Sequence, residues 1–397
     1  MHRVLIFAPF YPPAYLGGGP IRTISAIAQG APERYLPAVI TSDTDLGQQQ
    51  PLPVPSGAWA EHEGVSTFYF STKKCVPFAK ALTAGRAKRP DILYLSSFFN
   101  VKFSLIPQIL HLFGFFGRSR VVIAPRGEFG LGALAIKSTR KRRFINAYRL
   151  FRLQRHIIWH ASSLREANDI HSALGKEATV LIRENDSALP QHSLAPSMQV
   201  PLVDQLRAVF IGRISVVKGL EDLIQSFADV RTSFKFDIYG PEEDIQYSAR
   251  CRRAASELPS HIQVTFRGPI AHEKVRETLA GYDVMFFPTR GENFGHVIAE
   301  ALSVSCPVVC ADVTPWTGIL EAGGGRVVRH NSSGAWSQEI QTYALMTSQE
   351  RLAARVRAGQ AFDGWRQLSP DCHIFEMVTD HLGTTSNLSP QERSPCC

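Results

Sequence analysis

The sequence has no apolar run long enough to span a membrane. Its longest apolar zone, from Phe103 to Phe116, is interrupted by Pro107 and falls well short of the roughly 20 residues that a transmembrane helix needs. The stretch from Met1 to Phe7 is too short for a secretory signal and runs directly into a proline-rich turn. The sequence therefore predicts a cytoplasmic protein that begins with a β-strand.

Cysteine is also scarce. The seven cysteines are odd in number and scattered, which argues against a disulfide framework and against a structural zinc site. Cys306 and Cys310 flank an apolar segment and are expected to be buried thiols. Asp43-Thr44-Asp45 has the spacing of an Asp-x-Asp metal motif. Because it follows a predicted strand, where a polar turn is expected, we predict no metal there.

Acidic residues are missing from one stretch. The chain carries 43 basic and 35 acidic residues, a net charge of +8, and the segment from Lys137 to Arg155 holds eight basic residues and no acidic one. Its interleaved apolar residues predict an amphipathic helix. Either this helix binds an anionic membrane surface, which would make the protein peripheral on the inner face of the cell membrane, or its apolar stripe packs on its own domain. No nucleic-acid-binding motif accompanies the charge, so nucleic acid is not an expected partner.

Length and the order of elements indicate two domains. A chain of 397 residues exceeds what one hydrophobic core usually organises. Apolar runs alternate with helical stretches in both halves, which is typical of mostly parallel sheets covered by helices. We predict an N-terminal acceptor-side domain over 1–190, a linker over 191–204, a donor domain over 205–369, a C-terminal helix over 370–383 that would cross back to the first domain, and a flexible tail over 384–397.

The predicted strands follow the same alternation. They are Val4–Phe7, Leu36–Thr41, Val65–Phe70, Ile92–Leu95, Val121–Ala124, His156–Ala161 and Thr179–Ile182 in the first half, and Ala208–Ile211, Phe236–Tyr239, Val264–Phe266, Val284–Pro288 and Val308–Cys310 in the second. Most strands of the second half run into polar or glycine-rich loops. In open α/β sheets, ligands bind at the carboxyl ends of the strands.

One of these loops combines glycines with two cations. Arg213 and Lys218 stand in the segment from Gly212 to Leu220, between a predicted strand and a predicted helix. A glycine turn, two positive side chains and a helix N-terminus together predict a pocket for a pyrophosphate. The alternative is an ordinary strand-to-helix turn whose cations are solvated.

A second loop carries carboxylates. The strand ending at Pro288 leads into a glycine-rich loop with Glu292, and the helix that follows contains Glu300. Carboxylates accept hydrogen bonds from vicinal hydroxyls, so a sugar or a ribose diol is the expected partner of this pair. His296, at the start of the helix, could either cap the helix or contact a ligand. His160 lies in an apolar strand and is expected to be a core residue.

These motifs resemble the GT-B glycosyltransferases of the large retaining family 4, which builds bacterial surface polysaccharides and related glycoconjugates. The Glu292 and Glu300 pair matches the Glu-x7-Glu of that family, and the segments Phe7–Pro13 and Gly17–Arg22 resemble its opening. The resemblance covers almost the whole chain. It implies two Rossmann-like, doubly wound domains facing across a cleft, and an enzyme that moves a sugar from a UDP-, GDP- or ADP-linked donor to a glycan or polyprenyl-linked acceptor with retention of configuration.

The resemblance also implies roles for individual residues. Arg213 and Lys218 would hold the donor pyrophosphate and stabilise the charge on the leaving group. Glu292 would bind hydroxyls of the donor sugar, and Glu300 the ribose diol. Further donor contacts are implied for Gly18, Gly19, Gly240, Pro269, Ile270, Asn293, Phe294 and Gly295. No metal or cofactor is expected, because the two cations can supply the charge that a metal supplies elsewhere.

Two positions depart from the family pattern. Arg126-Gly127-Glu128 stands where many members have a histidine, so Arg126 is a candidate catalytic contact and Glu128 a weaker one. Arg183-Glu184-Asn185 replaces the usual Pro-Asn-Gly. An epimerase or a phosphorylase of the same fold fits less well, since the first usually lacks the glutamate pair and the second needs a cofactor-bearing lysine. A nucleotide-sugar-binding scaffold without turnover stays open as the alternative.

Overall fold

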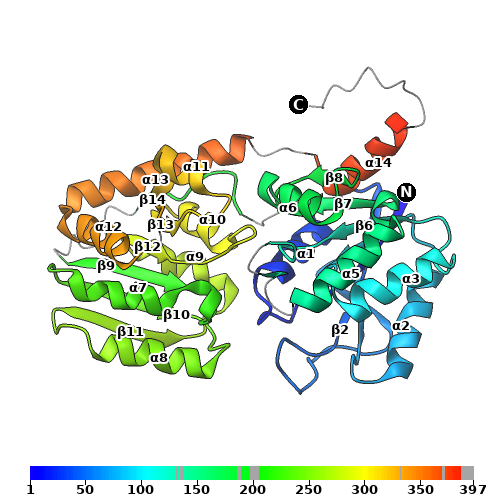
Figure 1. Ribbon diagram of the computed structural model, residues 1–397, viewed down its shortest axis with the longest axis horizontal. Helices are drawn as coiled ribbons and strands as arrows, with labels where there is room; N and C mark the ends of the chain where they lie inside the picture. Colours follow the sequence, from blue (N-terminus) through cyan, green and yellow to red (C-terminus); the bar gives the residue numbers. More distant parts are fainter. Residues whose placement is uncertain are drawn as a thin grey trace. The chain divides into compact units, whose positions relative to one another are not determined.

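The computed structural model describes residues 1–130, 133–134, 138–185, 189–196, 205–330, 332–368 and 372–385. The chain divides into two compact units (Figure 1). The first unit contains Met1–Ser187 and Pro370–Cys397, and the second unit contains Ala188–Ser369. Within the described ranges, no helix is long and apolar enough to cross a membrane.

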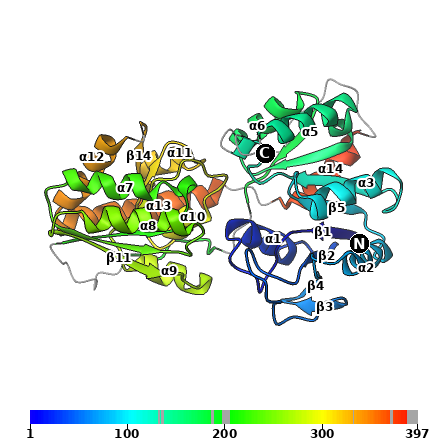
Figure 2. The ribbon, with the colours of Figure 1, turned by 60° about the horizontal axis from the view of Figure 1, so that its bottom comes forward.

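The first unit contains an eight-stranded sheet in the order β3-β4-β2-β1-β5-β6-β7-β8. All neighbouring strands pair in parallel except β3 and β4, which form an antiparallel ribbon at one edge (Figure 2). The strands are β1 (His2–Phe7), β2 (Tyr35–Ser42), β3 (Trp59–His62), β4 (Val65–Phe70), β5 (Ile92–Ser96), β6 (Arg120–Ala124), β7 (Ile157–Ala161) and β8 (Thr179–Ile182).

Both faces of this sheet are buried. Leu5 and Phe7 of β1 belong to one hydrophobic cluster, and Val4 and Ile6 belong to another. Successive side chains of a strand point to opposite faces, so helices must cover both sides. They are α1 (Gly19–Gln29), α2 (Cys75–Ala87), α3 (Ile106–Leu112), α5 (Ser138–Leu150), α6 (Leu164–Leu174) and α14 (Ile374–Thr385), with a π-helical turn at Val101–Leu105 and a 3-10 turn at Leu153–His156.

The helix α14 belongs to the first unit although it ends the described chain. Phe375 is fully buried in the same cluster as Val4 and Ile6. Glu376 accepts a 2.6 Å hydrogen bond from Arg34, and the hydroxyl of Tyr35 lies 2.7 Å from that of Thr379. The chain therefore returns to the unit in which it began. The predicted flexible tail lies outside the described residues from position 386 onward.

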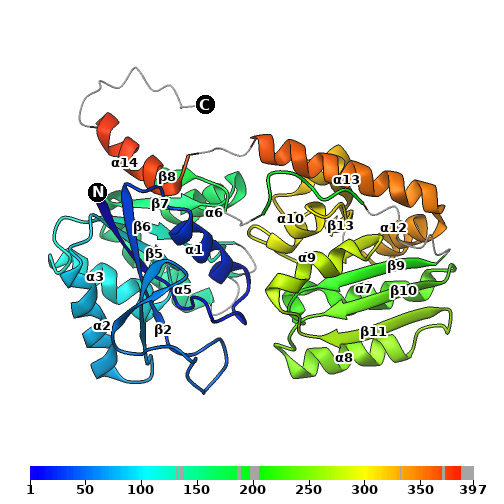
Figure 3. The ribbon, with the colours of Figure 1, turned by 180° about the vertical axis from the view of Figure 1, so that it is seen from behind.

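The second unit has a six-stranded parallel sheet in the order β11-β10-β9-β12-β13-β14. Its strands are β9 (Leu206–Ile211), β10 (Phe234–Tyr239), β11 (Ile262–Gly268), β12 (Val284–Phe287), β13 (Val308–Ala311) and β14 (Gly325–Val328). Figure 3 shows β9, β10 and β11 side by side. In chain order the strands run outward from β9 in one direction and then outward from β12 in the other. The sheet therefore has its topological switch point between β9 and β12, where ligands of such sheets bind.

Helices connect these strands. They are α7 (Leu220–Ser226), α8 (Ile245–Ser256), α9 (His272–Ala280), α10 (His296–Leu302), α11 (Thr317–Ile319), α12 (Ser333–Leu345) and α13 (Ser348–Leu368), with 3-10 turns at Val216–Lys218 and Phe227–Asp229 and a π-helical turn at Leu320–Gly324. The described part of the predicted linker packs on this unit, where the amide of Leu194 donates to the carbonyl of Ser303 at 2.8 Å. Residues 197–204 lie outside the described ranges.

Each predicted strand is present within two residues of its predicted ends, and in the described ranges two further strands, β3 and β14, were not predicted. β3 is a short edge strand with the sequence Trp-Ala-Glu-His, which has no apolar alternation. β14 begins with a glycine and follows two more glycines, which normally indicate a loop.

Candidate active site

The loops that leave β9 and β12 touch at the switch point. The amide of Arg290 donates to the carbonyl of Val217 at 2.8 Å. Gly219 has φ +66°, and a Cβ at this position would lie 2.3 Å from the carbonyl oxygen of Pro288. Only glycine allows both that conformation and that approach. The contact brings the segment with Lys218 against the segment with Glu292.

Lys218 and Glu292 form an ion pair. The Nζ of Lys218 lies 2.5 Å from Oε2 of Glu292, and the two side chains are 14% and 18% exposed. Lys218 also lies over the ring of Phe287, 5.0 Å from its centroid. The amide of Asn293 donates to the other carboxylate oxygen of Glu292 at 3.2 Å. Two residues that the sequence placed in separate motifs therefore form one polar centre.

Arg213 lies in the same loop as Lys218 but has a different partner. Its Nη1 is 2.7 Å from Oε1 of Glu243, and both side chains are about 40% exposed. At the predicted donor residue Gly240, the loop after β10 passes so close to the loop after β9 that an added Cβ would lie 1.8 Å from the carbonyl oxygen of Gly212. Only glycine fits there. The amide of Ile214 donates to the carbonyl of Pro241 at 2.9 Å. The loops after β9 and β10 thus form one packed surface.

Glu300 is buried within α10 and lies next to α9. Its side chain is 4% exposed, and Oε1 is 3.3 Å from Nδ1 of His272. His272 begins α9 shortly after Pro269 and Ile270, the residues predicted to line the base. The structure therefore places the predicted ribose carboxylate beside the end of the predicted base loop. His272 itself was not predicted from the sequence.

The loop from Gly291 to Gly295 is anchored by an aromatic side chain. The ring of Phe294 lies 4.8 Å from that of His296 and 5.5 Å from that of Trp316. The backbone turns at Gly295, which has φ +84°. The ring of His296 thus packs on this anchor at the start of α10.

Arg126 and Asn185 are hydrogen-bonded in the first unit, so the two departures from the family pattern meet. Nη1 of Arg126 donates to the side-chain oxygen of Asn185, and Nη2 donates to the hydroxyl of Tyr94 at 2.6 Å. Arg126 also has φ +54°, a conformation that carries strain for a residue with a Cβ. The surrounding contacts must therefore hold it in place.

His160 continues this network into the core. Its Nδ1 is 2.7 Å from the hydroxyl of Tyr94, and its Nε2 is 2.9 Å from the carbonyl of Arg183. The carbonyl can only accept, so Nε2 carries the proton and Nδ1 accepts from Tyr94. Burial lowers the pKa of His160 well below its usual value, and the charge of Arg126 lowers it further. His160 is thus a neutral core residue, as its apolar strand suggested.

Glu128 acts as an anchor for a turn. Its carboxylate accepts hydrogen bonds from the hydroxyl of Ser97 at 2.7 Å and from the amides of Phe98 and Phe99 at 2.5 and 3.1 Å. Burial raises the pKa of Glu128, and these hydrogen bonds oppose the rise. The amide of Gly127 donates to Glu166 at 2.6 Å. The loop that presents Arg126 is thus fixed on both sides.

The glycine-rich loop before α1 is held by Asp45, part of the Asp-x-Asp segment. Its Oδ2 accepts from the amides of Tyr15 and Leu16 at 2.9 and 3.1 Å. Gly18 has φ +67° and precedes α1, which begins at Gly19. Among the residues that the structure describes, no cluster of three or more histidine, cysteine or acidic side chains could hold a metal ion.

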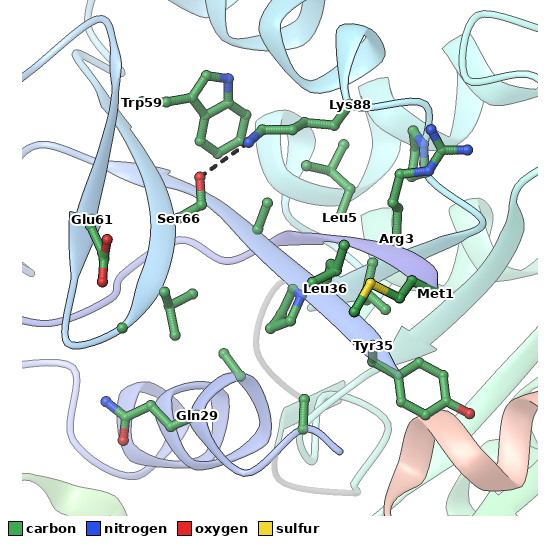
Figure 4. Close-up of a pocket in the computed structure, with 18 of the residues that line it drawn as sticks. Met1, Arg3, Leu5, Gln29, Tyr35, Leu36, Trp59, Glu61, Ser66 and Lys88 are labelled. Carbon is green, nitrogen blue, oxygen red and sulfur yellow. Dashed lines mark hydrogen bonds between the residues drawn. The ribbon is translucent and has the colours of Figure 1, made fainter. Parts of the chain in front are cut away.

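A cavity in the first unit lies away from Arg126. It has a volume of about 1010 Å³ and opens at the amino ends of β1, β2 and β4 (Figure 4). Lys88 bonds to Ser66 at 3.2 Å there and lies over Trp59. Arg126, in contrast, follows the carboxyl end of β6. The cavity is thus at the opposite edge of the sheet from Arg126.

The basic segment forms α5 and the turn after it. Ile145 and Tyr148 are buried in the core, whereas Leu150 and Phe151 are 78% and 70% exposed. The arginines of the segment are exposed, and Lys137 lies outside the described residues. The apolar stripe of the helix therefore packs on its own domain, and only its C-terminal end offers apolar groups beside the arginines.

Comparison with known proteins finds the same fold. Residues 199–360 match the family described as glycosyl transferases group 1. HepE from Anabaena, crystallised with UDP and glucose, superposes with a TM-score of 0.70 over 97% of this chain and 100% of its own, at 16% identity. Sucrose-phosphate synthase from Thermosynechococcus elongatus gives 0.69 over 97% and 98%, also at 16% identity. The chain has the GT-B fold.

The GT-B fold predicted from the motifs is thus confirmed, with two Rossmann-like α/β domains. A curated relative, the D-inositol 3-phosphate glycosyltransferase of Xylanimonas cellulosilytica, is 27% identical over 168 residues. That alignment covers 41% of this chain and 40% of the relative, so the chain matches about two fifths of the length of that protein. The sequence likeness is concentrated in the GT-B half that carries Lys218, Glu292 and Glu300.

Proposed function

We propose that the chain is a retaining glycosyltransferase that moves a sugar from a nucleoside-diphosphate sugar to a glycan or polyprenyl-linked acceptor in polysaccharide or glycoconjugate biosynthesis. The observation that carries the proposal is the Lys218 and Glu292 pair at the switch point of the second sheet. It lies within the segment that matches the glycosyl transferases group 1. The UDP bound to the similar HepE fold supports a nucleotide as part of the donor.

Lys218 and Glu292 would act on different parts of the donor. The ammonium group of Lys218 would bind the diphosphate and stabilise the negative charge that develops when the bond from the sugar to the phosphate oxygen breaks. The carboxylate of Glu292 would accept hydrogen bonds from sugar hydroxyls. Both groups are now bonded to each other. Donor binding would therefore exchange one ion pair for two sets of contacts with the substrate.

The other predicted residues would complete the donor site. Glu300, beside the loop of Pro269 and Ile270, would bind the ribose diol, and Arg213 would exchange its exposed partner Glu243 for a phosphate. Arg126 would contact the donor or the acceptor from the first unit. These roles need no metal or other cofactor, because Lys218 and Arg213 carry the charge.

The exposed end of α5 is proposed to rest on an anionic membrane surface. Leu150 and Phe151 are exposed next to Arg149 and Arg152, and such a mixture favours the boundary between lipid headgroups and acyl chains. A polyprenyl-linked acceptor would be presented at that surface. The protein would then work as a peripheral enzyme on the inner face of the membrane.

A scaffold that binds a nucleotide sugar without turnover is the alternative. The replaced family residues at Arg126 and Asn185 favour it. Their mutual hydrogen bond is compatible with either function. Donor binding without transfer or hydrolysis of the sugar would identify the scaffold.

A panel of nucleotides tests the proposed donor site. We would record the melting temperature of the wild type and of Glu300→Ala with UDP, GDP, ADP and their common sugars, because a ligand that binds only the folded state raises it. A shift specific to one base and lost in the variant supports the site and names the base. The absence of any shift in the wild type would contradict a nucleotide-sugar donor.

A further inference from the structure

Trp316 reaches the proposed donor loop from the segment after β13. Its indole Nε1 donates a hydrogen bond to the backbone carbonyl of Phe294 at 2.5 Å. Trp316 and Phe294 are only 2% and 4% exposed. The bond is thus shielded from water, and it joins two segments that follow neighbouring strands of the sheet, β12 and β13.

This bond fixes the direction of an amide group. In a trans peptide, the carbonyl of Phe294 and the N–H of Gly295 point in opposite directions. Because the carbonyl is held by the buried indole, the N–H of Gly295 points away from the buried tryptophan. Gly295 is one of the residues whose backbone is expected to contact the donor. Gly295 has φ +84°, and a Cβ added there would lie 3.1 Å from Cγ of Glu292, so the backbone passes close to the Glu292 side chain at this point.

The aromatic rings beneath the loop hold Trp316 itself in place. Its ring lies 4.8 Å from that of Trp365 and 5.5 Å from that of Phe294. For packing in this aromatic cluster, the ring surface of Trp316 would be sufficient without its N–H group. The indole N–H adds a directed bond to a backbone group, and losing that bond would leave the Phe294 carbonyl buried without this donor.

We propose that Trp316 is a positioning residue of the donor site, which orients the loop from Glu292 to Gly295 toward the diphosphate and sugar of the donor. The inference rests on the proposed function. Trp316 does not touch the reacting atoms in this scheme, because it acts through the Phe294 carbonyl. Its effect should therefore appear with ligands that reach this loop and be absent with ligands that stop short of it.

Isothermal titration of Trp316→Phe tests this role. The ligands are UMP, GMP and AMP, the matching diphosphates, and UDP-glucose, GDP-glucose and ADP-glucose. For the base that binds the wild type, we expect the sugar conjugate to bind about 10-fold more weakly to the variant, which corresponds to the loss of one buried hydrogen bond. The monophosphate of the same base should change by less than about twofold, because it lacks the groups that reach the loop.

Two further variants separate positioning from packing. Trp365→Phe makes the same chemical change in a neighbouring ring, whose centroid lies 6.4 Å from that of Phe294, and should leave the affinity for the sugar conjugate within about twofold of the wild type. Trp316→His keeps a ring N–H in a smaller side chain. If the hydrogen bond matters, Trp316→His should bind the sugar conjugate more tightly than Trp316→Phe. If only packing matters, the order is reversed, because histidine fills less of the aromatic cluster than phenylalanine does.

The possible outcomes are distinct. Equal losses for the monophosphate and the sugar conjugate, or no loss for either, would overturn the role of Trp316 while leaving the proposed function standing. A wild type that binds none of these nucleotides would overturn the proposed function, and the inference would fall with it.

Discussion

The Nζ of Lys218 lies 2.5 Å from Oε2 of Glu292, so the cation expected to hold the diphosphate is bonded to the carboxylate expected to hold the sugar. The two residues come from loops that leave neighbouring strands, β9 and β12. Both side chains are largely shielded from solvent. Removing either partner would leave the other charge without its counterion in a partly buried position.

Replacement of Lys218 should therefore lower the stability of the fold, and it should lower catalysis as well, because the donor diphosphate loses its cation. We predict that Lys218→Met, which keeps an unbranched apolar side chain against Phe287, lowers kcat by about 100-fold or more, as the loss of a transition-state donor does in other enzymes. The measurement is the initial rate of transfer from the nucleotide sugar, with circular dichroism to check the fold. A variant with wild-type turnover would remove Lys218 from the mechanism.

The sheets of both units could be predicted from the sequence because their strands either are apolar on both faces or, as in β10 and β11, alternate apolar and polar residues. The segment Val4–Phe7 shows this, since each of its residues is buried. The ribbon strand β3 and the glycine-led strand β14 could not, because neither carries an apolar run that distinguishes it from a loop. They join the sheet by pairing with β4 and β13, two strands that the sequence does predict.

The candidate site was predictable only in those residues that stand in recognisable motifs. Lys218 and Glu292 stand in motifs directly after strands, and the topology then brings them together. Tyr94, His272 and Trp316 carry no such signal. Tyr94 and Trp316 act through partners 32 and 22 residues away in the sequence, and contacts of this kind are made only by the folded chain.

The close approach at Gly240 predicts a large loss of stability on substitution. A Cβ there would lie 1.8 Å from the carbonyl oxygen of Gly212, and φ is +151°. We expect Gly240→Ala to lower the free energy of unfolding by about 3 kcal/mol or more, measured by urea denaturation, because backbone atoms must move apart.

A second glycine supplies the control. Gly364 lies within α13, and its ideal Cβ meets no atom within 4 Å. Alanine is favoured over glycine in a helix interior by about 1 kcal/mol, so Gly364→Ala should be neutral or stabilising. Similar losses in both variants would show that the crowding at Gly240 is not the cause.

His160 predicts a specific dependence of stability on pH. Burial holds its pKa well below the usual value in the folded protein, whereas in the unfolded chain it is about 6.5. As the pH falls through about 6.5, the unfolded state binds a proton that the folded state does not. The free energy of unfolding should therefore decrease toward low pH, with a slope of up to about 1.4 kcal/mol per pH unit from this group.

Removing the imidazole should remove this part of the slope. We expect His160→Gln to be less stable than the wild type at pH 8, because it disturbs the bonds to Tyr94 and Arg183, and to lose less stability between pH 7 and pH 5. Urea denaturation across this range measures both effects. His156→Gln, at an exposed position beside it in sequence, is the matched control and should keep the wild-type slope. An unchanged slope in His160→Gln would mean that other groups govern it.

The exposed end of α5 predicts binding to anionic vesicles. Each arginine near such a surface contributes about 1 kcal/mol. The triple substitution of Arg142, Arg143 and Arg149 by glutamine should therefore weaken binding to phosphatidylglycerol vesicles by about 100-fold in a sedimentation assay. Leu150→Ser with Phe151→Ser should weaken it as well, through lost apolar contact. Hydrolysis of the nucleotide sugar in solution should be unaffected, since none of these residues belongs to the proposed donor site.

Net charge alone could produce the same loss, and a second helix distinguishes the two causes. Arg250, Arg252 and Arg253 are three exposed arginines on α8 of the second unit. Their replacement by glutamine removes the same charge from a helix without exposed aromatic residues. If α5 is the membrane-binding element, this control should bind vesicles almost as well as the wild type. If both triple variants lose binding equally, the vesicles are attracted by the net charge of the protein, and α5 has no special role.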